Sequence, residues 1–221
     1  MAYLDARNQQ ENRTGLLPDL KERGFRPGKS MTDVRIALAG ASGCGKTTLM
    51  DFLAQELGLP VNPVGSRSVA LAMGFMNPYD VDAAGQRPAF QERLVRDKIA
   101  WEAKTPSFVT DRTTADNLAY HALHALDDLT GFVIDAAAEG MRRYTHVLYC
   151  PLAEHQSLAG DAVRRAGRSY HEVYDALLYG LLHRFCGDAV VRVSGDDLAR
   201  RKQFVLATVT GWLSPSAESR R

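Results

Sequence analysis

A glycine-rich segment at residues 40–48 has the residue types and spacing of a phosphate-binding loop. It reads Gly-Ala-Ser-Gly-Cys-Gly-Lys-Thr-Thr and fits the complete pattern G-x-x-x-x-G-K-[ST]. Glycines allow a backbone to wrap a phosphate with successive N–H groups pointing inward. Lys46 can reach the β- and γ-phosphates, and the Thr47 hydroxyl can ligate Mg²⁺. We therefore predict an ATP and Mg²⁺ site formed by Gly40, Ser42, Gly43, Cys44, Gly45, Lys46, Thr47 and Thr48.

The segments on either side of this loop occur in the order that a phosphate loop requires. Residues 34–39 form an apolar run typical of a short buried strand. Apolar residues then recur at helical spacing up to Leu57, and Gly58 ends that predicted helix. The order of strand, loop and helix favours a phosphate loop over a chance glycine-rich turn.

Composition and charge place the chain among ordinary soluble α/β proteins. It has 221 residues, 45% of them hydrophobic and 24% charged, with a formal net charge of +1. It contains no apolar run of about 18 residues, and its polar N-terminus does not resemble a secretory signal. The three cysteines form no C-x-x-C pair. We therefore expect a cytoplasmic protein with reduced thiols, no membrane contact and no cysteine metal site.

The pattern along the chain predicts one compact domain at 31–213, preceded by a flexible basic arm at 1–30 and followed by a tail at 214–221. Strands and helices alternate, which indicates βαβ units and a parallel sheet of about five strands with helices on both faces. The expected strands are 34–39, 59–64, 107–110, 146–150 and 189–193. Beyond the helix after the loop, the expected helices are 66–73, 90–104, 114–126, 130–143, 154–165, 170–185 and 197–213, with 74–79 irregular.

Asp111 and Arg112 follow directly after the predicted strand at 107–110. In a parallel sheet the carboxyl ends of the strands form the ligand-binding edge. A carboxylate there suits a Mg²⁺ ion or an acceptor hydroxyl, which makes Asp111 both a metal ligand and a catalytic candidate. Arg112 offers a bidentate fork for an acceptor phosphate or a substrate oxygen, so Arg112 and Lys46 are predicted catalytic residues as well. The alternative for Asp111 is that it only caps the following helix.

At this point the chain resembles the P-loop nucleoside and nucleotide kinase group. Asp111-Arg112 is similar to the Asp-Arg signature of thymidylate kinases, and Asp-Arg-x-x-x-Asp-x-x-Ala-Tyr resembles phage and bacterial nucleotide kinase-like ATPases. The resemblance covers roughly residues 34–200. It implies a P-loop three-layer sandwich with a small lid that carries arginines. It also implies an enzyme with ATP as phosphoryl donor.

The resemblance places the lid after the strand at 146–150, where Arg164, Arg165 and Arg168 occur. Cations in a lid neutralise the charge on the transferring phosphoryl group. Arg164 and Arg168 are therefore predicted catalytic residues, although a solvated basic helix end is the alternative.

An acceptor pocket is expected after the second strand and on the long helix that follows. Arg67 is predicted to bind an acceptor phosphate, and Gln91 to read the edge of a base. Phe75 and Tyr79 are predicted to flank that base, with core packing as their alternative, and Arg112 is a further substrate contact.

The sequence is compatible with three functions. The first is a phosphotransferase that moves the γ-phosphate of ATP to a (deoxy)nucleoside monophosphate or a related nucleotide acceptor. The second is a phage-type kinase that acts on 5-hydroxymethyluracil within DNA, with the arm and Arg200-Arg201-Lys202 following the phosphates. The third is a switch or motor NTPase, although the chain lacks the Asn-Lys-x-Asp motif of GTPases. The choice between nucleoside and nucleotide acceptor, and the presence of a homodimer, stay open.

Overall fold

The computed structural model describes residues 33–124, 131–152 and 168–213. The predicted arm at 1–30, the tail at 214–221 and the helix expected at 154–165 lie outside these residues. No helix within the described ranges is long and apolar enough to cross a bilayer. The described part contains the phosphate loop and the Asp-Arg pair, whereas Arg164 lies outside it.

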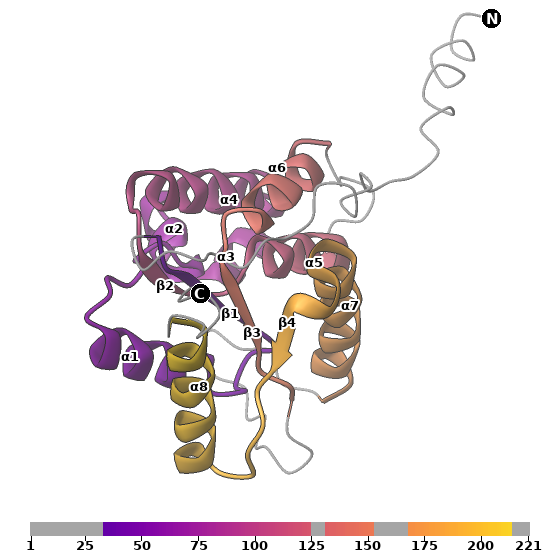
Figure 1. The fold of residues 1–221 in the computed structure, drawn as a ribbon. Helices are drawn as coiled ribbons and strands as arrows, with labels where there is room; N and C mark the ends of the chain where they lie inside the picture. The colour runs from indigo at the N-terminus through magenta and orange to yellow at the C-terminus, as the bar shows by residue number, and fades with distance from the viewer. Residues whose placement is uncertain (1–32, 125–130, 153–167, 214–221) are drawn as a thin grey trace, which may run out of the picture.

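A parallel sheet of four strands forms the centre of the molecule (Figure 1). The strands lie in the order β2-β1-β3-β4. Their bounds are β1 Arg35–Ala39, β2 Phe108–Asp111, β3 His146–Tyr149 and β4 Val190–Arg192. Because β1 is central and buried, both of its faces are apolar, as is usual in parallel sheets. The predicted α/β fold with a parallel sheet is confirmed, with one strand fewer among the described residues than expected.

The missing fifth strand is the one predicted at 59–64. In the structure this segment makes only an isolated parallel bridge between Val61 and Val109. Pro60 and Pro63 flank the bridge, and a proline has no N–H group to donate to a ladder. The pairing with β2 therefore stops after one residue.

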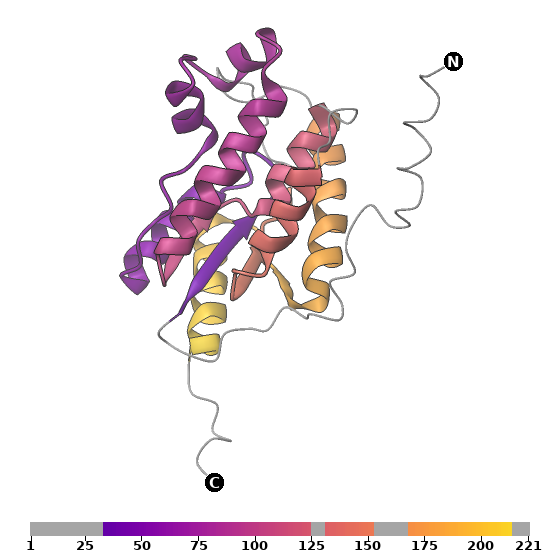
Figure 2. The same cartoon turned by 90° about the horizontal axis from the view of Figure 1, so that it is seen from above.

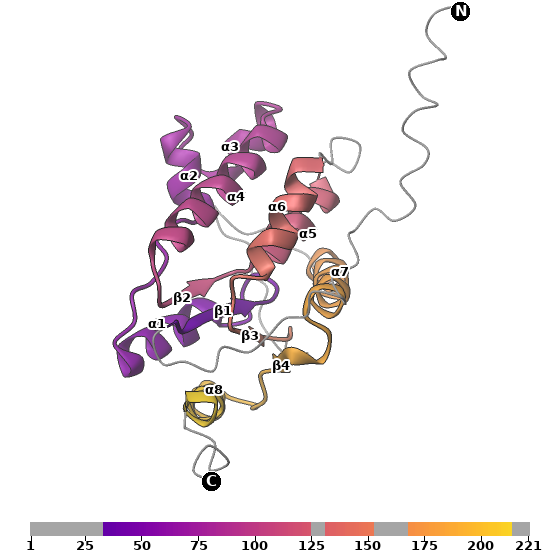
Figure 3. The same ribbon diagram turned by 45° about the horizontal axis from the view of Figure 1, so that its top comes forward.

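Helices cover both faces of the sheet, and Figure 3 shows α1 and α8 on the face opposite to α4, α5, α6 and α7. Figure 2 shows the latter helices lying roughly side by side. Ile36 and Leu38 pack into the core beneath α1 and α8, while Ala37 and Ala39 belong to the core on the other face. The bounds are α1 Lys46–Leu57, α8 Leu198–Leu213, α4 Arg87–Lys104, α5 Thr114–His124, α6 Gly131–Met141 and α7 Arg168–Cys186.

Two short helices, α2 (Ser66–Ala72) and α3 (Pro78–Ala83), pack with α4 beside the sheet (Figure 3). They share a small apolar core of their own with the first half of α4. Phe75, in the connection between α2 and α3, packs against this core. The two helices therefore form a wall that stands next to the ligand-binding edge of the sheet.

The helix α3 corrects the prediction of an irregular segment at 74–79. Asn77 caps it, because the Asn77 Oδ1 accepts hydrogen bonds from the N–H groups of Tyr79 and Asp80 at 2.9 and 3.2 Å. The Asp80 carboxylate in turn accepts a bond from the Asn77 N–H at 3.1 Å, which completes a capping box. Pro78 occupies the first turn, where a proline is favoured.

Candidate active site

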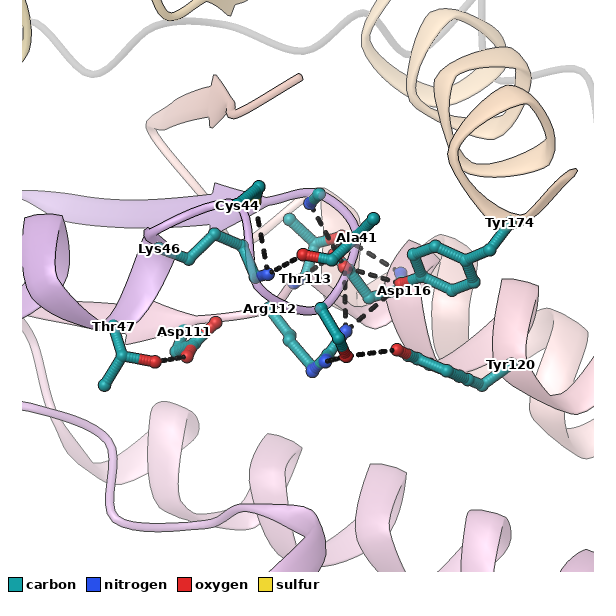
Figure 4. Close-up of polar contacts among 12 residues, drawn as sticks. Ala41, Cys44, Lys46, Thr47, Asp111, Arg112, Thr113, Asp116, Tyr120 and Tyr174 are labelled. Carbon is teal, nitrogen blue, oxygen red and sulfur yellow. Dashed lines mark hydrogen bonds and ion pairs between the residues drawn. The ribbon is translucent and has the colours of Figure 1, made fainter. Parts of the chain in front are cut away.

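The phosphate loop connects β1 to α1 at the carboxyl edge of the sheet (Figure 4). Gly40 and Gly45 have φ angles of +143° and +87°, which side chains rarely adopt. A Cβ atom at Gly40 would lie 2.3 Å from the carbonyl oxygen of Cys150. Glycine at position 40 thus allows the loop to turn directly against the end of β3.

Lys46 is the first residue of α1, and its ammonium group is held by the loop. Its Nζ donates a hydrogen bond to the Ala41 carbonyl oxygen at 2.7 Å, and it lies 3.5 Å from the Cys44 sulfur (Figure 4). Burial would lower the pKa of Lys46, but negative charge on Cys44 and Asp111 raises it above its ordinary value. Lys46 is therefore a buried cation, and a phosphate oxygen can replace the loop carbonyl as its hydrogen-bond acceptor.

Cys44 and Cys150 place two buried, free thiols next to Lys46. A hydrogen bond from Cys150 lowers the pKa of Cys44 to about 6 against the effect of burial, and Lys46 and Arg201 lower it further. The same hydrogen bond raises the pKa of Cys150 well above its ordinary value. The negative charge that gathers on Cys44 helps to keep Lys46 protonated.

Arg201, in the first turn of α8, also contacts the loop. Its Nη1 donates a hydrogen bond to the Cys44 carbonyl oxygen at 2.7 Å, and its Nη2 donates to the Pro151 carbonyl oxygen at 3.3 Å. In a trans peptide the C=O group and the following N–H group point in opposite directions. The contact therefore directs the Gly45 N–H away from Arg201, and it fixes one of the peptides that form the anion-binding concavity.

Asp111 ends β2 beside Thr47, as Figure 4 shows. The Thr47 hydroxyl donates a hydrogen bond to Asp111 Oδ2 at 2.6 Å, while Asp111 Oδ1 is buried with no hydrogen-bond partner in the described chain. Burial would raise the pKa of Asp111, but Lys46 and Arg112 outweigh it and lower that pKa. An ionised carboxylate with a spare oxygen next to a hydroxyl is a donor set that fits Mg²⁺.

The capping alternative for Asp111 receives no support from these contacts. The helix α5 begins at Thr114, and the carboxylate at its start is that of Asp116, which accepts a hydrogen bond from the Thr113 N–H at 2.8 Å. Asp111 bonds instead to Thr47 of the phosphate loop.

Asp116 is a site residue to which the sequence analysis assigned no role. It is fully buried, and its carboxylate accepts hydrogen bonds from the Thr113 hydroxyl and the Tyr174 hydroxyl, both at 2.8 Å. It lies 3.6 Å from Arg112 as an ion pair, and the Gly40 N–H donates to it at 3.4 Å. Asp116 thus joins α5, α7 and the start of the phosphate loop (Figure 4). Its place in the Asp-Arg-x-x-x-Asp pattern was the available signal.

Arg112 adopts a strained backbone conformation with φ of +77°, the only positive φ outside glycine in the described residues. Its Nη2 donates to the Ser42 hydroxyl at 3.0 Å and its Nη1 to the Tyr174 hydroxyl at 3.3 Å. The guanidinium carbon lies 4.7 Å from the centre of the Tyr120 ring. These contacts aim the Arg112 side chain along the phosphate loop (Figure 4).

A cavity of about 460 Å³ lies beside the loop. Ser42, Thr47, Asp111 and Arg112 contribute to its lining, so it meets the phosphate loop at the Asp-Arg pair. One face of α4 and one face of α5 form two of its walls. Their lining residues include Phe90, Gln91, Leu94 and Lys98 from α4, and Asn117, Tyr120 and His124 from α5.

Most of the predicted acceptor residues line this cavity. Arg67, Tyr79 and Gln91 do so together with Arg112. Phe75 does not: the turn after α2 packs it against the small core of α2, α3 and α4, which is the packing alternative named for it.

The other predicted site residues have different positions. Thr48 is exposed in the first turn of α1, next to the loop. Arg168 begins α7, is exposed, and pairs with Glu172 at 2.7 Å. Arg164 and Arg165 lie outside the described residues, so the lid remains a prediction.

Comparison with solved structures shows that the chain is similar in fold to several of them. The NadR protein in complex with NAD and AMP-PNP has a TM-score of 0.63 and 15% identity, over 82% of this chain and 50% of that chain. Deoxyadenosine kinase from M. mycoides has a TM-score of 0.55 and 13% identity, over 80% and 99% of the two chains. Shikimate kinase from Aquifex aeolicus has a TM-score of 0.54 and 14% identity, over 83% and 100%. The chain therefore has a P-loop kinase-like fold.

A family model described as an AAA domain matches residues 35–201. The chain belongs to this AAA-domain family. In addition, a stretch of 51 residues is 43% identical to Protein GCN20 of Saccharomyces cerevisiae. This stretch makes up 23% of this chain and 7% of GCN20. The chain thus spans about half the length of NadR and a small fraction of GCN20.

Proposed function

We propose that this protein is an ATP-dependent phosphotransferase that moves the γ-phosphate to a nucleoside, a (deoxy)nucleoside monophosphate or a related nucleotide. One observation carries the proposal. The phosphate loop and the Asp-Arg pair both line a cavity large enough for a small-molecule acceptor. A donor loop that opens on a second cavity of acceptor size is what transfer to an acceptor requires, whereas simple hydrolysis needs only water.

Each residue of the site has a role that phosphoryl transfer requires. The acceptor oxygen forms a bond to the γ-phosphorus as the bond to the bridging oxygen of ADP breaks, and the proton of a hydroxyl acceptor passes to water. Lys46 and Arg112 offset the negative charge on the phosphoryl oxygens. Thr47 and Asp111 would hold Mg²⁺, which neutralises phosphate charge when it is bound. Because the pKa of Asp111 is lowered, this carboxylate is a weak base and is better suited to orienting the hydroxyl or holding the metal.

The DNA-directed alternative gains no support from the basic residues at 200–202. Arg201 bonds to the phosphate loop, Arg200 pairs with Asp196 at 2.8 Å, and Lys202 lies over the ring of Phe52. These side chains make contacts within the chain rather than forming a free basic stripe.

The contact between Arg201 and the loop predicts that a residue far from the loop in sequence contributes to ATP binding. We expect Arg201→Ala to weaken ATP binding about tenfold, because a charge-assisted hydrogen bond that orients a loop peptide is lost. Isothermal titration with a non-hydrolysable ATP analogue measures this. Arg200→Ala removes a neighbouring, exposed arginine and is expected to bind like the wild type. Equal affinity of both variants and the wild type would show that Arg201 does not order the loop.

The function itself is tested by measuring conversion of ATP to ADP against a panel of nucleosides, nucleoside monophosphates and oligonucleotides. We expect turnover to depend on one class of small acceptor and to be low without it. ATP hydrolysis that proceeds at the same rate with and without every acceptor would favour a switch or motor NTPase. Turnover that requires an oligonucleotide would favour the DNA-directed kinase.

A further inference from the structure

Two residues that line the cavity have buried amide oxygens without a partner in the described part of the chain. Gln91 on α4 is 2% exposed and Asn117 on α5 is 3% exposed. Both residues line the cavity, and neither the Gln91 Oε1 nor the Asn117 Oδ1 accepts a hydrogen bond within the described chain. Buried polar atoms normally have partners, and leaving one without a partner destabilises the fold. Two such oxygens, on cavity-lining residues of two different helices, point to a ligand that donates hydrogen bonds to both.

Most of the positive charge around the cavity is already paired. Four cations line it in the described chain, and three of these pair with carboxylates, whereas Asp111 adds one further negative charge. The three pairs are Arg87–Asp82, Lys98–Glu102 and Arg112–Asp116. The fourth cation, Arg67, is exposed at the start of α2. A phosphate dianion on the acceptor would therefore find no uncompensated buried cation among these residues.

Aromatic rings add a suitable surface for a flat group. Tyr120 and His124 are stacked in parallel along the face of α5 that lines the cavity. Phe90 of α4 and Tyr170 of α7 line the same space. Rings of this kind bind nucleobases by stacking, independently of charge.

We propose that the acceptor is a neutral nucleoside rather than its monophosphate, and that it donates hydrogen bonds to Gln91 and Asn117. A nucleoside supplies such donors from amino or ring N–H groups of the base and from sugar hydroxyls. The proposal rests on the proposed kinase function and narrows its substrate class. It assigns Asn117 to the acceptor site, and it places the acceptor hydroxyl at the end of the cavity where Asp111 and the phosphate loop meet.

The first test compares each common nucleoside with its own 5′-monophosphate, both as phosphate acceptors and as ligands in titrations without ATP. We expect at least one nucleoside to bind and to accept phosphate with a kcat/KM at least about tenfold above that of its monophosphate. A monophosphate that is preferred would overturn the proposal. If no acceptor is phosphorylated, the proposed kinase function is refuted. The titrations without ATP then decide whether the cavity binds a neutral nucleoside. Binding of a neutral nucleoside would uphold the cavity assignment, whereas failure of every nucleoside to bind would refute it.

The second test uses Gln91→Met and Asn117→Leu, which replace each amide by an apolar side chain of similar size. We expect the KM for the nucleoside to rise about tenfold or more while the KM for ATP is unchanged. We also expect the Tm to stay level or to rise, because a buried oxygen without a partner is removed. Arg93→Met, at an exposed position of α4 outside the cavity, is the control and should leave all three quantities unchanged. An unchanged nucleoside KM, or a clear fall in Tm, would show that the amides serve the fold instead.

Discussion

Lys46→Ala is expected to lower phosphoryl transfer by at least about a hundredfold, to the limit of detection in a routine assay. The Lys46 ammonium is buried, stays protonated and lies on a loop carbonyl at 2.7 Å, where β- and γ-phosphate oxygens can replace that contact. Alanine removes this charge and leaves Arg112 as the remaining side chain that we propose offsets the phosphoryl charge. Steady-state turnover with the preferred acceptor measures the effect.

The fold should survive this substitution, because Lys46 contributes a cation and two loop hydrogen bonds rather than core packing. Circular dichroism and thermal unfolding check that point. Lys104→Ala, at the exposed end of α4, removes a lysine that lies outside the site and should behave like the wild type. Turnover of Lys46→Ala close to the wild-type value would refute the assignment of the donor site.

Asp111→Asn is expected to lower turnover by about two orders of magnitude or more. Asparagine has the same shape and can still accept the hydrogen bond from Thr47, so the main change is loss of the negative charge. The variant should also require a higher Mg²⁺ concentration for half-maximal rate, because the buried Oδ1 is no longer part of a carboxylate. A magnesium titration of the initial rate measures both effects.

Asp135→Asn is the matched control, since Asp135 is exposed on α6 away from the site. A purely structural role for Asp111 predicts a different outcome. In that case the free energy of unfolding would fall by about 1 kcal/mol while turnover and its magnesium dependence were retained.

The donor half of the site could be predicted from sequence because its chemistry is local. Gly40, Gly45, Lys46 and Thr47 lie within one loop, and the loop's conformation depends on glycines at fixed positions. The strand that ends at Asp111 was also recognisable, since a short apolar run before a polar pair indicates the carboxyl edge of a sheet.

What could not be predicted depends on contacts between distant segments. Arg201 reaches Cys44 across 157 positions of sequence, and Asp116 reaches Tyr174 across 58. Neither pair has a spacing that a local pattern reveals. Phe75 was also assigned wrongly to the acceptor pocket, although it packs against a small core. An aromatic residue suits both core packing and ligand contact, so the residue type alone does not distinguish them. In contrast, the helix at Pro78 was missed although Asn77 and Asp80 carried its capping signal.

The central claim is that the γ-phosphate of ATP is transferred to a small acceptor rather than to water. Phosphorus NMR of a complete reaction with ATP, Mg²⁺ and the preferred nucleoside tests it most directly. We predict that ADP and a new phosphomonoester appear in equal amounts, with little inorganic phosphate. Formation of ADP and inorganic phosphate in equal amounts, with no phosphomonoester signal, would contradict the account.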